Sequence, residues 1–186
     1  MDKKLLILDV DETLIHGSES ILASQPDYAC SWCYLYLRPH VREFMEFCLE
    51  HFRVAIWSTA SLDHVEMCLN QIGCHTYPFE FVWGAERCTL VLDAPDDFGR
   101  GDRFHWRKNL CKLRRRKDFC LEHTIMLDDS PEKLDRHYGN LLRIRPFEGD
   151  PGDRELLRVM RYLLELKDAP NIRAIEKRGW EYRYPI

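Results

Sequence analysis

The chain has 186 residues, of which 45% are hydrophobic and 12% aromatic, and its formal net charge is −4. This length and composition suit one domain with a full hydrophobic core and argue against disorder. The acidic balance argues against stable binding of nucleic acid.

The apolar segments argue against entry into a membrane. Only four apolar residues separate Lys4 from Asp9, far fewer than a secretory signal needs, and no apolar stretch approaches the roughly 18 residues of a membrane span. We therefore expect a cytoplasmic protein, or a nuclear one if the cell is eukaryotic, and the sequence leaves its oligomeric state open. Its eight scattered cysteines are expected to be reduced thiols. The lone C-x-x-C of Cys30 and Cys33 has no second pair with which to hold zinc.

Apolar runs and helical spacing predict strands that alternate with helices. Strands are expected at residues 3–9, 53–57, 124–127 and 141–144. Helices are expected after Arg38-Pro39, between Leu62 and Gly73, near 107–116 and over 153–167.

Two segments do not fit this alternation. Residues 14–37 are mixed and aromatic, as in a loop or short hairpin, and residues 74–106 predict a small β-rich insertion with a turn at Gly99–Asp102. Neither segment is long enough for a large cap domain. We expect residues 1–186 to form one α/β domain with a mostly parallel central sheet flanked by helices.

Polar residues follow three of the predicted strands: Asp9, Ser58-Thr59 and Asp128-Asp129. The carboxyl ends of parallel strands meet at one crevice, where open α/β sheets bind their ligands. Taken alone, Asp9-x-Asp11 and Asp128-Asp129 are each compatible with an ordinary turn, because Asp and Asn hydrogen-bond their own backbone. Together, however, these two pairs bring four carboxylates to one edge of the sheet, where their negative charges repel one another. A divalent cation relieves this repulsion, and oxygen ligands favour Mg²⁺, which often also binds a substrate phosphate.

Phosphoryl transfer also needs hydrogen bonds and positive charge on the phosphoryl oxygens. Thr59 can supply a hydroxyl. Lys108 or a neighbour in the basic run 107–117 can supply the charge, and sequence physics alone does not choose among them. Two competing mechanisms are excluded, because the chain contains neither a C-x5-R thiol-phosphatase loop nor a G-x-x-x-x-G-K-[ST] phosphate loop.

The segment Asp9-Val10-Asp11-Glu12-Thr13 matches the D-x-D-x-T signature of the haloacid dehalogenase (HAD) superfamily of phosphohydrolases. Further along, the chain resembles the branch that contains the small RNA-polymerase C-terminal-domain phosphatases, also described as FCP/SCP-like or NLI-interacting-factor-like. The segments that carry this likeness are Arg38–Phe44, Trp57–Leu62, Arg107–Leu110 and Leu127–Pro131. The resemblance implies a Rossmann-like HAD fold and a phosphoric monoester hydrolase.

The resemblance also implies residue roles. Asp9 would be the nucleophile that forms an aspartyl-phosphate, and Asp11 would act first as general acid and then as general base. Thr59 and Lys108 would bind the phosphoryl group. Mg²⁺ would be held by Asp9, the backbone carbonyl of Asp11, and Asp129. Thr13 and Asp128 would lie behind these residues, with Asp128 orienting Lys108.

One departure concerns Asp129, since the small phosphatases often have asparagine there. The extra negative charge is expected to tighten metal binding and to raise the need for Lys108. The missing cap predicts an open site and therefore a phosphorylated protein or peptide substrate. A capless phosphatase for small phosphate esters and a non-catalytic binding module with the same fold are the alternatives.

Overall fold

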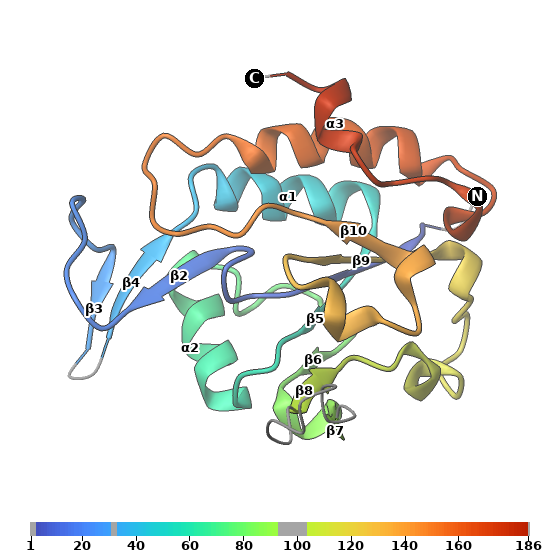
Figure 1. Cartoon of the computed structure of the whole chain (residues 1–186), viewed down its shortest axis with the longest axis horizontal. Coiled ribbons are helices and arrows are strands. Elements are labelled where there is room, and N and C mark those ends of the chain that lie inside the picture. Colours follow the sequence, from blue (N-terminus) through green and yellow to red (C-terminus); the bar gives the residue numbers. More distant parts are fainter. Residues whose placement is uncertain (1–2, 31–32, 93–103, 186) are drawn as a thin grey trace, which may run out of the picture.

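The computed structural model describes residues 3–30, 33–92 and 104–185. Figure 1 shows a central sheet with the long helices α1 and α3 side by side above it. The α-helices are α1 (Val41–His51), α2 (Leu62–Ile72) and α3 (Glu155–Lys167). The strands are β1 (Leu5–Leu8), β2 (Ile15–Ser18), β3 (Tyr28–Ala29), β4 (Tyr34–Leu37), β5 (Arg53–Trp57), β6 (Val82–Trp83), β7 (Thr89–Leu92), β8 (Phe104–Arg107), β9 (Thr124–Asp128) and β10 (Leu141–Arg143).

The central sheet has five strands in the order β10-β9-β1-β5-β6, and every neighbouring pair is parallel. This arrangement confirms the predicted α/β fold with a mostly parallel sheet. β1 lies between β9 and β5, so the residues that follow these three strands emerge next to one another.

The two faces of the sheet are covered differently. Leu6 and Leu8 of β1 point to a core that also receives the apolar faces of all three α-helices. Leu5 and Ile7 point to the opposite core, which is closed by Phe81 and by the short 3-10 helices Leu110–Leu113 and Pro131–Leu134. The strand is therefore apolar on both faces, which explains its continuous apolar run.

The helix ends follow from local sequence. The Ser61 hydroxyl accepts a hydrogen bond from the His64 N–H at the start of α2, and Gly73 ends that helix in the left-handed conformation with φ 88°. Helix α1 begins at Val41, just after the predicted Arg38-Pro39 start. Helix α3 begins two residues after the predicted position 153.

The prediction of a helical segment near 107–116 was largely wrong. Only the 3-10 helix Leu110–Leu113 forms there, and Leu110 and Leu113 are its buried residues. A spacing of three places both leucines on one side of a tight 3-10 turn. The basic residues 114–117 that follow are exposed and bring no further apolar contact to support an α-helix.

The two segments outside the main alternation contain antiparallel strands. Residues 14–37 form a three-stranded sheet in the order β2-β4-β3, and the insertion contains the two-stranded sheet of β7 and β8. The predicted turn at 99–102 lies outside the described residues. None of the eight cysteines, all of them described, takes part in a disulfide, and the Sγ atoms of Cys30 and Cys33 are 3.2 Å apart.

One buried guanidinium joins three distant segments. Arg38 is 1% exposed, and its Nε and Nη2 both donate to the Asp153 carboxylate at 2.9 Å. The same group donates to the backbone carbonyls of Thr13 (3.1 Å) and Arg145 (2.9 Å). It therefore fixes the loop after β1 against the segments that follow β10 and precede α3.

We expect Asp153→Asn to destabilise the protein by about 3 kcal/mol at pH 7, because it leaves the buried Arg38 charge without its partner. Burial alone would raise the pKa of Asp153, but Arg38 outweighs it and holds the pKa below the ordinary 3.8. The stabilisation is therefore present above about pH 3.8 and is lost as the pH falls through the lower folded-state pKa. Urea denaturation at pH 7 and pH 3 measures this difference, with the exposed Glu66→Gln as control. Equal stability of wild type and Asp153→Asn at pH 7 would contradict it.

Candidate active site

The Asp9 carboxylate lies at the end of β1 and is 1% exposed. Its Oδ1 is 2.8 Å from Lys108 Nζ, and its Oδ2 is 2.7 Å from Lys133 Nζ. Oδ1 also accepts a hydrogen bond from the N–H of Val10 at 2.9 Å. The Asp9 side chain is thus held by two ammonium groups, one on each oxygen.

Asp128 ends β9, the strand next to β1, and is fully buried. Its Oδ2 accepts a hydrogen bond from Lys108 at 2.6 Å, and its Oδ1 accepts one from the Ser130 N–H at 3.0 Å. Lys108, itself fully buried, therefore lies between two buried carboxylates. Through this contact Asp128 would orient Lys108, a role that stays a prediction.

Burial and charge move the pKa values of the two aspartates in opposite directions. Burial alone would raise the pKa of Asp9, but Lys108 and Lys133 outweigh it and lower that pKa to about 2. Burial, reinforced by the negative charge of Asp9, raises the pKa of Asp128 to about 7 in spite of the same lysines. Asp9 is therefore ionised at neutral pH, while Asp128 holds its proton more strongly than an ordinary aspartate.

Asp11 has a different environment, because its side chain is 34% exposed. Its Oδ2 accepts a hydrogen bond from the Ser58 hydroxyl at 3.0 Å, and its Oδ1 lies 2.8 Å from His64 Nε2. Hydrogen bonding to Asp11 raises the pKa of His64. The two carboxylates of the opening motif thus differ in exposure and in partners.

The two predicted threonines make fewer contacts. Thr59 follows Ser58 beyond β5 and is half-buried, and its hydroxyl has no hydrogen-bond partner among the described residues. The Thr13 hydroxyl is buried and has no partner there either, although the Thr13 carbonyl accepts a bond from Arg38. The roles assigned to both residues remain predictions.

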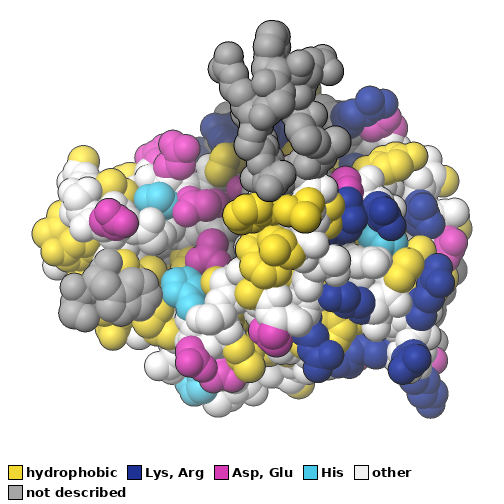
Figure 2. Space-filling view, turned by 60° about the horizontal axis from the view of Figure 1, so that its bottom comes forward, with side chains coloured by type: hydrophobic (Ala, Val, Ile, Leu, Met, Phe, Trp, Pro, Cys, Tyr) yellow, Lys and Arg dark blue, Asp and Glu magenta, His cyan; other side chains and the backbone are white. Residues whose placement is uncertain are grey.

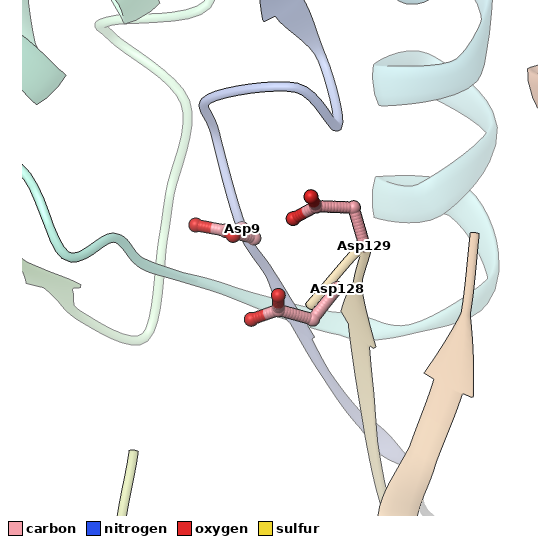
Figure 3. Close-up of side chains that lie close together, drawn as sticks. All are labelled: Asp9, Asp128 and Asp129. Atoms are coloured by element: carbon pink, nitrogen blue, oxygen red, sulfur yellow. The ribbon is translucent and has the colours of Figure 1, made fainter. Parts of the chain in front are cut away.

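Three carboxylates gather in one place, as Figure 3 shows. One oxygen each from Asp9, Asp128 and Asp129 lies within 4.8 Å of the others. The predicted metal ligands were Asp9, Asp129 and the Asp11 carbonyl, so Asp128 is an additional side chain at this point. An all-oxygen donor set of this kind fits Mg²⁺.

The Lys133 ammonium lies among these carboxylates, 2.7 Å from Asp9, 3.4 Å from Asp128 and 3.5 Å from Asp129. Burial opposes its charge, but the three carboxylates prevail and raise its pKa. Sequence reasoning missed Lys133, although it follows Asp129 by four residues across the turn Pro131–Leu134. It placed Ser58 beside Thr59 at a strand end without giving it a role, and it missed His64, for which the sequence offered no signal.

Residues 4–173 match the NLI interacting factor-like phosphatase family. The chain is 27% identical over 201 residues to ubiquitin-like domain-containing CTD phosphatase 1 of Xenopus tropicalis, covering 99% of this chain and 56% of that protein. It is 26% identical over 197 residues to the Homo sapiens protein of the same name, covering 96% of this chain and 54% of that protein. The chain therefore spans about half the length of the curated relatives it matches.

The fold is also similar to the solved structure of the fission yeast RNA polymerase II CTD phosphatase Fcp1-R271A bound to beryllium fluoride. The TM-score is 0.55 at 16% identity, over 97% of this chain and 54% of that one. The region that matches the family covers most of the chain. The chain belongs to the NLI interacting factor-like phosphatase family, which confirms the resemblance seen in the sequence.

We expect Lys108→Met to lower the free energy of unfolding by about 3 kcal/mol, because it leaves two buried carboxylates close together with Lys133 as their remaining cationic partner among the described residues. Adding Asp128→Asn to this variant removes one of the two charges and should restore at least about 1 kcal/mol. A double-mutant cycle in urea measures both effects, with the exposed Lys117→Met as control. Strictly additive losses would show that Lys108 and Asp128 are not coupled.

Proposed function

We propose that this chain is a Mg²⁺-dependent phosphomonoesterase that acts through an aspartyl-phosphate formed on Asp9, and that residues 1–186 constitute one catalytic domain. The observation that carries the proposal is that the carboxylates of Asp9 and Asp11 differ in burial and in hydrogen-bond partners. Asp9 is buried between two ammonium groups, whereas Asp11 is partly exposed and held by a hydroxyl and an imidazole. Family membership and the acidic cluster support it.

Asp9 suits the role of nucleophile because its pKa of about 2 keeps it ionised at neutral pH. Lys108 contacts the same carboxylate and can balance negative charge as the phosphoryl group arrives. Asp128, on the far side of Lys108, holds that ammonium in place. Thr59, which has no internal hydrogen-bond partner among the described residues, is free to donate its hydroxyl to a phosphoryl oxygen.

Asp11 suits the role of acid and base because it is the more exposed of the two carboxylates. It would protonate the leaving oxygen and then remove a proton from the water that hydrolyses the intermediate. Ser58 and His64 fix the orientation of its carboxylate from opposite oxygens. Both residues emerge beyond the carboxyl end of β5, so the strand order brings them to Asp11.

The candidate metal ligands are Asp9, Asp129 and the backbone carbonyl of Asp11, with Asp128 within reach. A bound Mg²⁺ would offset negative charge on the phosphoryl oxygens. Because the Lys133 ammonium lies among three of these carboxylates, a cation that binds there must displace it. The Lys133 ammonium would therefore compete with the metal ion for these carboxylates.

A phosphorylated protein or peptide is the substrate class that we favour. Relatives of the chain are named as CTD phosphatases, and the described residues form no large domain over the strand ends. Among those residues, no helix is both long and apolar enough to cross a membrane. The cytoplasmic or nuclear location predicted from the sequence remains part of this proposal.

Turnover of phosphoserine, phosphothreonine and phosphotyrosine peptides against a panel of sugar and nucleotide phosphates tests the substrate class. Peptides should show the higher kcat/KM. Faster hydrolysis of the small esters would replace this proposal with the small-molecule phosphatase.

Asp9→Asn should abolish turnover of every phosphate ester, because an amide cannot form the acyl-phosphate. Trapping of the phosphoenzyme in acid-quenched wild-type protein, with intact-mass detection of the added phosphoryl group, provides the direct measurement. Circular dichroism must show that the variant is folded. Full activity in folded Asp9→Asn would refute the nucleophile assignment, and inactivity of the wild type on all esters would favour a binding module.

Asp11→Asn should slow hydrolysis of a phosphoserine peptide by roughly 10²–10⁴-fold. The loss should be smaller with p-nitrophenyl phosphate, whose leaving group needs no proton. His64→Gln should show the same asymmetry to a lesser degree because it loosens Asp11, and the exposed His75→Gln serves as its control. Equal losses on both substrates would contradict the role of Asp11 as an acid.

Lys133→Met should tighten Mg²⁺ binding about tenfold or more, since the metal no longer has to displace an ammonium group. The same variant should lower the unfolding temperature of the metal-free protein, because three carboxylates lose one of their two cationic partners. Isothermal titration calorimetry with Mg²⁺ and thermal denaturation measure the two effects, with Lys117→Met as control. Weaker Mg²⁺ binding would mean that Lys133 supports the site instead of competing for it.

A further inference from the structure

We propose that a basic cavity beside the acidic site, hereafter the arginine cavity, binds a second phosphorylated side chain of the same peptide substrate. The cavity has a volume of about 930 Å³ and lies between the end of β10 and the segment 173–182. The identity of its occupant as a peptide rests on the proposed function. The existence of an anion site rests only on the cavity itself.

The lining of the arginine cavity is strongly basic. It contains six cationic and three acidic side chains, a net charge of +3 within a chain whose formal net charge is −4. Figure 2 shows a similar imbalance over one face of the molecule, where Lys and Arg side chains gather on the right while Asp, Glu and His lie mainly to the left. Such a concentration of positive charge attracts anions.

Three of these cations form the walls of the cavity and are already satisfied. Lys177 Nζ donates to three backbone carbonyls at 2.7–3.0 Å. Arg158 bonds Glu155 at 2.7 Å and the Tyr184 carbonyl at 2.8 Å, and Arg178 pairs with Glu176 at 2.6 Å. Arg158 also donates to the Glu181 carbonyl and so joins α3 to the segment 173–182, and the pairs with Glu155 and Glu176 use two of the three acidic residues.

The other three cations have capacity to bind a ligand. The guanidinium groups of Arg143 and Arg173 make no hydrogen bond or ion pair with any described residue, and both side chains are exposed. Arg145 is 4.0 Å from its nearest carboxylate, on Glu155, and its side chain is 67% exposed. Guanidinium groups bind phosphate through paired N–H donors, which favours a phosphate over a single carboxylate.

The arginine cavity adjoins the candidate active site. Arg143 lies opposite Asp128 in the parallel pairing of β10 with β9, which places their backbones about one strand spacing of roughly 4.8 Å apart. Pro131 lines the cavity and follows Asp129 by two residues. The cavity runs along β10, and its part around Arg143 and Pro131 lies at the same end of the sheet as the candidate active site, within the span of a few residues of an extended peptide.

The size and the aromatic lining of the cavity favour a peptide over a lone ion. A volume of 930 Å³ far exceeds a phosphate group and leaves room for flanking residues. Tyr138 and Tyr182 line the cavity and are 79% and 85% exposed. Tyrosine and arginine together are typical of surfaces that bind polypeptides.

The test compares peptides with one phosphoserine and with two phosphoserines spaced two, three or four residues apart. In wild type, the best-spaced doubly phosphorylated peptide should have a KM about tenfold or more below that of the singly phosphorylated one. The double variant Arg143→Ala/Arg173→Ala should abolish this advantage while kcat/KM for p-nitrophenyl phosphate stays unchanged. Arg115→Ala/Arg161→Ala, which removes two exposed arginines outside the cavity, is the matched control.

Equal KM values for the singly and doubly phosphorylated peptides in wild type, or an advantage that survives in Arg143→Ala/Arg173→Ala, would overturn the proposal. A further arm measures Kd of the doubly phosphorylated peptide for Asp9→Asn, with and without the two arginine substitutions. Tight binding that depends on Arg143 and Arg173 supports the cavity even if wild type hydrolyses no peptide, a result that would refute only the proposed function. Inorganic pyrophosphate that binds as tightly as the peptide, through the same arginines, would assign the cavity to a free phosphate compound and overturn the peptide proposal.

Discussion

Two aspartates buried at the ends of neighbouring strands impose the main constraint on this fold. Asp9 and Asp128 cannot both be ionised and dehydrated without a counterion between them. Lys108 supplies it from a segment that follows the insertion, where its N–H also donates to the Lys133 carbonyl at 2.8 Å. Lys108 and Lys133 together therefore balance the buried charge at these strand ends, and the 3-10 helices Leu110–Leu113 and Pro131–Leu134 next to them pack against the second face of the sheet.

The same arrangement gives the two aspartates of the opening motif, Asp9 and Asp11, different environments. Asp9 continues the line of β1 into the charged interior, where its N–H donates to the Leu127 carbonyl of β9. Asp11 lies two residues later, beyond the regular sheet, where its side chain reaches solvent and the residues after β5. A spacing of two residues thus gives one buried, ionised carboxylate, that of Asp9, and one partly exposed carboxylate, that of Asp11. The chain belongs to a phosphatase family, and the different local environments support the two separate roles proposed for these carboxylates.

Sequence reasoning succeeded where one physical signal dominated. The apolar runs of β1, β5 and β9 and the periodicity of α2 and α3 located these elements, and the parallel sheet then brought Asp9, Asp128 and Asp129 together. It failed for contacts that depend on the path of a loop. Lys133 and His64 reach the site only because a turn and a helix start happen to face the strand ends. Likewise, a helical segment was predicted near 107–116, but too few apolar residues were present there to hold an α-helix against the sheet.

The hydrogen bonds of Arg38 bear on the order in which parts of the protein become fixed during synthesis. Arg38 donates to both carboxylate oxygens of Asp153, which lies 115 residues further along the chain. It also donates to the carbonyl of Thr13, two residues after Asp11. During synthesis, a nascent chain that has just exposed Asp129 already contains every acidic residue of the site, yet it lacks the carboxylate that fixes the loop around Asp11. The loop around Asp11 is therefore expected to become fixed only after Asp153 and α3 have been synthesised and have docked. A nascent chain that ends before Asp153 would carry the acidic residues of the site without this tie between the Asp11 loop and the start of α3.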